Sequence, residues 1–181
     1  MILGIKELHK LVNDIKLVEN LCEREVNSPE GAGFDLRLGA VYEIEGDGFL
    51  GIEERDTPNA KLIKKYEEIK KDENFFVFNP GKYFLIKTIE KVNLPTTLSG
   101  IIFPRTTLFR SGLGLFNGIV QPGYSGELTF GICNLGESKI KLSLGSRVVH
   151  ITFHEVSGYG NQYKGQWQGG RVATEKKEKQ I

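Results

Sequence analysis

Two arginines and two threonines lie close together in the segment FPRTTLFRSGLG, residues 103–114. Arg105 and Arg110 offer guanidinium groups, and Thr106 and Thr107 offer hydroxyls. Guanidinium groups bind phosphate oxygens through paired hydrogen bonds, and hydroxyls add neutral donors. The spacing therefore predicts a loop that can hold a di- or triphosphate. A surface loop with ordinary arginine contacts is the alternative.

Two other polar, glycine-rich segments carry aromatic residues. In QPGYSGE (121–127) we expect an exposed Tyr124 on a tight turn, where it could stack on a sugar or a base. An ordinary aromatic residue in a turn is the alternative. The segment YKGQWQGG (163–170) is polar and aromatic, a composition that suits a lid closing over a bound anion.

Motifs of the common enzyme classes are absent: the sequence has no Walker loop, no GxSxG, no HExxH and no zinc-like Cys/His cluster. His150 and His154 are four residues apart, but VVHITFHEV around them alternates like a strand. A structural role is therefore favoured over a metal pair. Cys22 and Cys133 lie far apart and are predicted to be reduced thiols.

The elements that position these segments follow from the spacing of apolar residues. Leu8, Leu11, Val12 and Ile15 recur at helical spacing, which predicts a short amphipathic helix over residues 5–15 that ends near Asn13-Asp14. From Phe34 onward apolar residues alternate with polar ones, as in a half-buried strand. Later short apolar segments are punctuated by Pro and Gly, which is typical of a barrel or jelly-roll.

A dense run of charge interrupts this pattern between Glu53 and Asn74. Leu62, Tyr66 and Ile69 recur there at helical spacing, which predicts a surface helix within a charge-rich insertion over 46–74. A solvated loop is the simpler alternative. We expect one mostly-β domain over 1–173 and a flexible charged tail over 174–181.

The overall composition excludes several protein classes. The chain has 181 residues, with 24 Lys and Arg against 23 Asp and Glu, so its formal net charge is +1. This balance argues against general nucleic-acid binding. The sequence contains no apolar run of membrane-spanning length, and its start is too short and mixed for a secretory signal. We expect a soluble cytoplasmic protein.

Five segments, taken together and in this order, resemble the dUTPase and dCTP deaminase superfamily. GAGFDLRLG (31–39) resembles its first motif, with Asp35 in the acidic position, and FPRTTLFRSGL resembles its phosphate-binding motif. GIVQPGYSGE resembles the third motif, and LGSRVVHITF the fourth, where His150 replaces the usual Gln. The start MILGIKEL and the segment YKGQWQGGRVAT with Tyr159 are similar to the dCTP deaminase branch, which includes bifunctional dCTP deaminase/dUTPases.

The resemblance implies a distorted jelly-roll fold and a homotrimer with sites at the subunit interfaces. It also implies dUTP or dCTP as ligand, and Mg²⁺ bound through the triphosphate with Asp35 near the water shell of the ion. Base recognition would use backbone groups within residues 115–119. Catalytic roles would fall to Gln121, Arg110 and Thr106, and substrate binding to Arg105, Thr107, Asn117, Tyr124, Tyr159, Gln166 and Trp167.

Two departures from the family pattern put the reaction in question. The third motif of dUTPases opens with an Asp that activates the attacking water, and the matching residue here is Gln121. An amide can orient a water but cannot take its proton, a contribution of about 10²–10⁴ in rate. The Glu that shuttles protons in dCTP deaminases is matched by Gly131.

Three functions therefore stay open. The first is a deaminase-like enzyme with a rearranged catalytic group, and the second is dUTP hydrolysis with Gln121 positioning the water. The third is a catalytically silent deoxynucleotide-binding protein that acts as a sensor or structural subunit.

Overall fold

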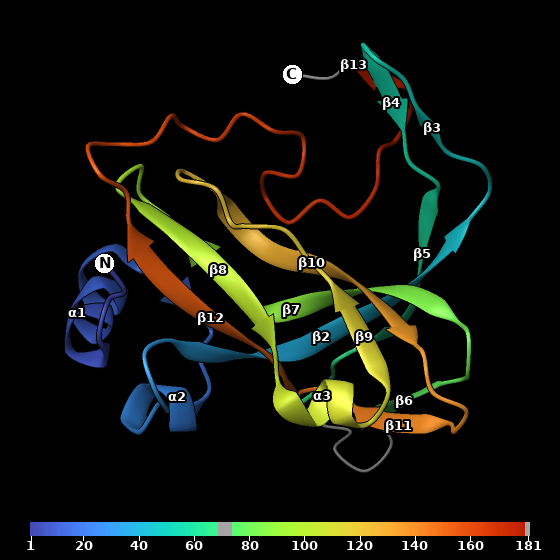
Figure 1. The fold of residues 1–181 in the computed structure, drawn as a ribbon, viewed down its shortest axis with the longest axis horizontal. Helices are drawn as coiled ribbons and strands as arrows, with labels where there is room; N and C mark the ends of the chain where they lie inside the picture. The colour runs from blue at the N-terminus through green and yellow to red at the C-terminus, as the bar shows by residue number, and fades with distance from the viewer. Residues whose placement is uncertain (69–73, 180–181) are drawn as a thin grey trace.

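Alternating apolar residues place most of the strand residues in one large antiparallel sheet. The computed structural model describes residues 1–68 and 74–179. Strands of the large sheet follow the order β8-β12-β2-β7-β10-β9, with β1 paired to β7 and β5 paired to β2. The sheet curls into a distorted, nearly closed barrel (Figure 1), which confirms the predicted mostly-β fold of the dUTPase-like type. The elements are α1 (Ile5–Ile15), β1 (Val18–Glu19), α2 (Glu23–Asn27), β2 (Phe34–Glu45), β3 (Phe49–Leu50), β4 (Glu54–Asp56), β5 (Asn59–Lys65), β6 (Phe75–Phe78), β7 (Tyr83–Asn93), β8 (Leu98–Pro104), α3 (Thr106–Arg110), β9 (Leu113–Phe116), β10 (Ser125–Asn134), β11 (Ile140–Ser143), β12 (Arg147–Glu155) and β13 (Glu178–Lys179).

The core lies inside the barrel and is filled from β2, β7 and β12. Phe34 of β2 is fully buried and meets Phe153 of β12 edge-on, with ring centroids 6.4 Å apart. Full burial of one such side chain contributes about 1.5–3 kcal/mol. Along β7 every second residue points inward, and the inward set includes the polar residues Thr88 and Glu90.

The helix predicted at the N-terminus is confirmed. α1 covers Ile5–Ile15 and buries Leu8 completely, while Ile15 at its end is 43% exposed. It ends where Lys16 adopts a left-handed conformation with φ 54°. None of the helices in the two described ranges is long and apolar enough to cross a membrane.

The helix predicted within the charge-rich insertion is wrong for the part that the structure describes. Residues 59–65 form β5, which pairs antiparallel with β2, so that Leu62 lies opposite Tyr42. β2 is 12 residues long and extends beyond its pairing with β12 and β7. The backbone groups that these two strands leave free are satisfied by β5. This long-range pairing overrides a weak helical spacing. Ile69, the third residue of that spacing, lies outside the described residues.

Residues 174–179, within the predicted charged tail, make specific contacts in the structure. Thr174 is buried, and its hydroxyl donates to the Asp56 carboxylate over 2.8 Å. β13 then pairs with β4, so the C-terminal residues lie beside the β3–β4 ribbon (Figure 1). Backbone pairing and side-chain hydrogen bonds connect residues 174–179 to the β3–β4 ribbon, and the flexibility of the tail stays a prediction.

Candidate functional site

The predicted phosphate loop forms the short helix α3 at the end of β8. Leu108 is buried and anchors the helix, and the Arg105 N–H donates to the Val148 carbonyl over 3.0 Å. Thr106, Thr107 and Arg110 are exposed. The structure therefore presents both hydroxyls and one guanidinium group to solvent, as phosphate binding requires.

Asp35 is the centre of a partly buried ion-pair network beside α3. One carboxylate oxygen, Oδ2, accepts hydrogen bonds from Arg105 and, over 2.9 Å, from Arg147. The other, Oδ1, lies 2.9 Å from Nδ1 of His150. The neighbouring Glu25 is fully buried and accepts the Asp35 backbone N–H over 2.9 Å. Burial lowers the pKa of His150, which favours the neutral imidazole.

This network bears on the predicted magnesium site. Both carboxylate oxygens of Asp35 are already engaged, by two arginines and a histidine. Within residues 1–68 and 74–179, no group of three His, Cys, Asp or Glu side chains could hold a metal ion. The residues around Asp35 therefore do not fit a metal ion bound directly by the protein, whereas magnesium bound through a triphosphate stays a prediction. His154 has a separate partner, the Thr152 hydroxyl, 2.9 Å from its Nε2, in agreement with a structural role.

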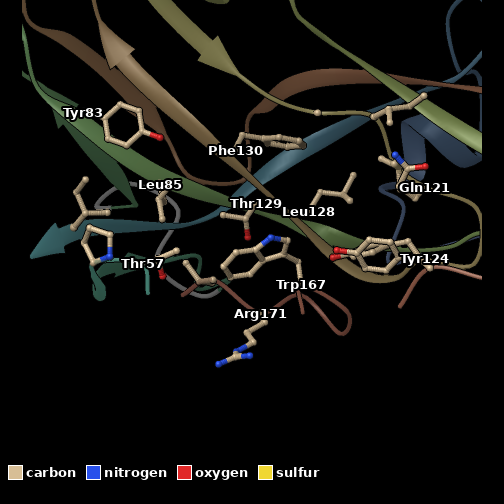
Figure 2. Close-up of a pocket in the computed structure, with 17 residues that line it drawn as sticks. Thr57, Tyr83, Leu85, Gln121, Tyr124, Leu128, Thr129, Phe130, Trp167 and Arg171 are labelled. Atoms are coloured by element: carbon tan, nitrogen blue, oxygen red, sulfur yellow. The ribbon is translucent and has the colours of Figure 1, made fainter. Parts of the chain in front are cut away.

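A cavity of about 450 Å³ lies between β10, the loop before it and the C-terminal segment (Figure 2). Gln121, Tyr124 and Trp167, three predicted site residues, line it together. The loop residues Gly118 and Ile119 also line it, within the segment predicted to recognise the base. None of the described lining residues carries a carboxylate, so the cavity offers no strong general base.

Tyr124 is buried, contrary to the exposed position predicted for it. Only 8% of the residue is accessible, and its hydroxyl donates to the Glu127 carbonyl over 2.6 Å. Burial raises its pKa to about 12. Tyr163 of the C-terminal segment packs edge-on against the Tyr124 ring, with ring centroids 5.6 Å apart. The sequence of the turn alone could not predict this contact, because Tyr163 lies far along the chain.

The predicted lid lies along the third-motif turn and covers the cavity. Amide groups of Gln162 and Gln168 donate to the Gly123 carbonyl over 2.7 and 3.1 Å. The segment places Trp167 against the cavity (Figure 2). Gln166 has both side-chain polar atoms buried without a partner in the described chain, whereas Tyr159 is 81% exposed. Whether the segment opens and closes stays a prediction.

Sequence reasoning missed Tyr83, which occupies the space beside Gly131. A β-carbon at Gly131 would collide with the Tyr83 hydroxyl and lie 2.8 Å from its Cζ. Tyr83 lines the cavity from β7, but no local pattern marks it, because the contact depends on the register between β7 and β10. Asn117 does not line the cavity, and its amide donates to the Ile102 carbonyl over 3.1 Å.

Two groups of the predicted residues line separate hollows in one copy of the chain. Arg105 and Thr107 line a second hollow of about 670 Å³, together with Arg147. This hollow shares no lining residue with the cavity of Gln121 and Trp167. In Figure 1, α3 and the C-terminal segment lie at opposite edges of the barrel.

Comparison with known proteins identifies the family. Residues 2–156 match the family model described as dCTP deaminase-like. A probable deoxyuridine 5'-triphosphate nucleotidohydrolase from Methanothermobacter thermautotrophicus is 29% identical over 168 residues, which cover 93% of this chain and 99% of that protein. A dCTP deaminase from Pyrobaculum calidifontis is 32% identical over 175 residues, which cover 96% of this chain and 95% of that protein.

A solved structure supports the same fold. The crystal structure of 2'-deoxycytidine 5'-triphosphate deaminase from Agrobacterium tumefaciens superposes with a TM-score of 0.63 at 18% identity. The superposition covers 84% of this chain and 48% of that chain, about half of its length. With the match to the family model over most of its length, the chain belongs to the dCTP deaminase-like family of the dUTPase/dCTP deaminase superfamily.

Proposed function

We propose that this protein binds deoxypyrimidine nucleoside triphosphates and hydrolyses dUTP to dUMP and pyrophosphate. The exposed hydroxyls of Thr106 and Thr107 and the exposed Arg110, at the position of the family's phosphate-binding motif, carry this proposal. A guanidinium group and two hydroxyls supply the donors that a triphosphate needs.

Hydrolysis is favoured over deamination because the two reactions need proton transfer at different places. Deamination needs an acid–base group beside the pyrimidine ring, where Gly131 has no side chain and the described cavity wall has no carboxylate. Hydrolysis adds water to a phosphorus atom and releases pyrophosphate, and the water can be held by an amide. Gln121 would orient that water at the exposed edge of the cavity, at a rate about 10²–10⁴ lower than with a general base.

A catalytically silent nucleotide-binding protein is the second candidate. It is favoured by one observation, the absence of a carboxylate from the described lining of the cavity. Binding would then serve sensing or assembly, with the phosphate motif retained and turnover lost.

We further propose that the complete site forms between copies of the chain. Arg105 and Thr107 of the phosphate motif line one hollow in a single copy, and Gln121 and Trp167 line another. A homotrimer with sites at its subunit interfaces would bring α3 of one copy to the cavity of another. Because Asp35 is engaged in ion pairs, magnesium would have to arrive with the triphosphate.

The test is to incubate the protein with dUTP or dCTP and Mg²⁺ and to measure nucleotides, pyrophosphate and ammonia. We expect pyrophosphate from dUTP and no ammonia from dCTP. Gln121→Asp should raise the rate of pyrophosphate release. Gln121→Asn should not, because asparagine has the same shape as aspartate but cannot act as a base. Ammonia from dCTP would contradict the proposal, and tight binding without any product would establish the silent alternative.

A further inference from the structure

Tyr83 reaches into the cavity only because position 131 lacks a side chain. It begins β7, opposite Cys133 of β10, and its hydroxyl overlies Gly131, where any β-carbon would displace it. The rings of Tyr83 and Phe116 face each other at a tilt, with centroids 6.0 Å apart. Figure 2 shows the Tyr83 hydroxyl directed into the cavity.

The Tyr83 hydroxyl is available to a ligand. Neither described part of the chain supplies a hydrogen-bond partner for it. The Tyr124 hydroxyl, by contrast, already donates a hydrogen bond to the Glu127 carbonyl. Burial raises the pKa of Tyr83, so the phenol keeps its proton at neutral pH. Thr129, further along the same wall, has a buried hydroxyl without a partner in the described chain. The wall therefore holds two polar atoms that a ligand could satisfy.

The two pyrimidine bases differ at the atom that such a donor would meet. Uracil has a carbonyl oxygen at position 4, which accepts a hydrogen bond, and cytosine has an amino group there, which donates one. With cytosine the phenol would have to turn its proton away from the base, into a largely apolar cavity. Tyr83 is 40% exposed, so water offsets part of the cost of an unmatched donor, but a site that hydrogen-bonds one group of a ligand still discriminates against an analogue that lacks this group.

We propose that the Tyr83 hydroxyl donates a hydrogen bond to the 4-oxygen of uracil, and that it selects dUTP over dCTP. This inference rests on the proposed function, because it requires that the base enter the cavity. Gly118 and Ile119, from the segment expected to recognise the base, line the same cavity.

The test is to measure the dissociation constants of non-hydrolysable dUTP and dCTP analogues by calorimetry. We expect the unaltered protein to bind the dUTP analogue about tenfold or more tightly than the dCTP analogue. Tyr83→Phe removes only the hydroxyl and should weaken dUTP binding about three- to tenfold while leaving dCTP binding unchanged. Gly131→Ala displaces the hydroxyl without removing it, and it should shift the preference in the same direction.

Tyr42→Phe is the matched control, because it removes a phenol hydroxyl from the neighbouring strand β2, outside the cavity lining. It should change neither constant. Binding of both analogues without preference, or equal weakening of both by Tyr83→Phe, would overturn the inference and leave the proposed function standing. If neither analogue binds the unaltered protein, both the proposed function and the inference are overturned.

Discussion

The C-terminal segment rests on the third-motif turn at a point where a methyl group does not fit. Gly126 has φ 149°, and a β-carbon there would lie 2.7 Å from the carbonyl carbon of Gly169 and collide with the nitrogen of Gly170. These are backbone atoms, so they cannot swing aside as the tip of a side chain does. Gly126→Ala is therefore expected to release the segment from the turn.

The size of the effect follows from the contacts beside Gly126. Two hydrogen bonds would be lost, from the Gly169 N–H to the Ser125 carbonyl at 2.8 Å and from the Ser125 N–H to Oε1 of Gln168 at 3.0 Å. Each contributes about 0.5–1.5 kcal/mol, and backbone strain in the alanine adds about 1 kcal/mol. The total of about 2–4 kcal/mol shifts the equilibrium toward the released segment about 30- to 1,000-fold.

Trp167 reports this release directly, because it is the chain's single tryptophan and lines the cavity. In Gly126→Ala we expect red-shifted emission, stronger quenching by acrylamide and faster trypsin cleavage after Lys164. Gly81→Ala is the control: its φ of 71° brings similar strain, but its β-carbon would meet no atom within 4 Å. Unchanged emission and unchanged protease resistance in Gly126→Ala would refute the docking of the segment on this turn.

Two further predictions concern the phosphate motif and the core. Arg110→Ala should weaken binding of both dUTP and dCTP about 10- to 100-fold in calorimetry, because a hydrogen bond from a charged donor is lost. Lys10→Ala, an exposed change on α1, is the control. If Arg110→Ala binds both nucleotides as tightly as the unaltered protein, α3 does not belong to the site. Glu90 is fully buried and accepts hydrogen bonds from Arg37, yet burial raises the pKa of its carboxyl group in the folded state. Protonation of Glu90 therefore stabilises the folded protein at pH values below the pKa of the unfolded state. This contribution is lost as the pH rises through the pKa of the folded state. Urea denaturation should measure the free energy of unfolding of the unaltered protein and of Glu90→Gln at both pH 4 and pH 7. The difference between the two proteins should be smaller at pH 7 than at pH 4. A difference that does not change with pH would contradict the raised pKa.

Features that depend on local pattern could be predicted from the sequence. The helical spacing around Leu8 predicted α1, which ends at Ile15, just beyond the expected end near Asn13-Asp14, and alternation from Phe34 predicted β2. Each of these elements buries one face, which the spacing of its own apolar residues records. The motif order then identified the family and the segments that form the cavity and α3.

Features that depend on long-range contacts could not be predicted in this way. β5 exists because β2 offers a free edge, and Tyr124 is buried because Tyr163 packs on it from 39 residues further along the chain. The engagement of Asp35 by Arg105 and Arg147 likewise joins three distant segments. Such contacts leave no periodic signal within any one segment.

The two departures from the family pattern are unequal in their consequences for the chemistry. Gln121 is exposed at the edge of the cavity, so a carboxylate could replace its amide there without displacing a neighbour. Gly131 lies beneath the Tyr83 ring, so a glutamate at 131 would first have to displace that ring. A base for hydrolysis would therefore need one substitution alone, whereas a base for deamination would need a substitution and a shift of the Tyr83 side chain. This asymmetry is a further reason to favour the proposed dUTP hydrolysis over dCTP deamination.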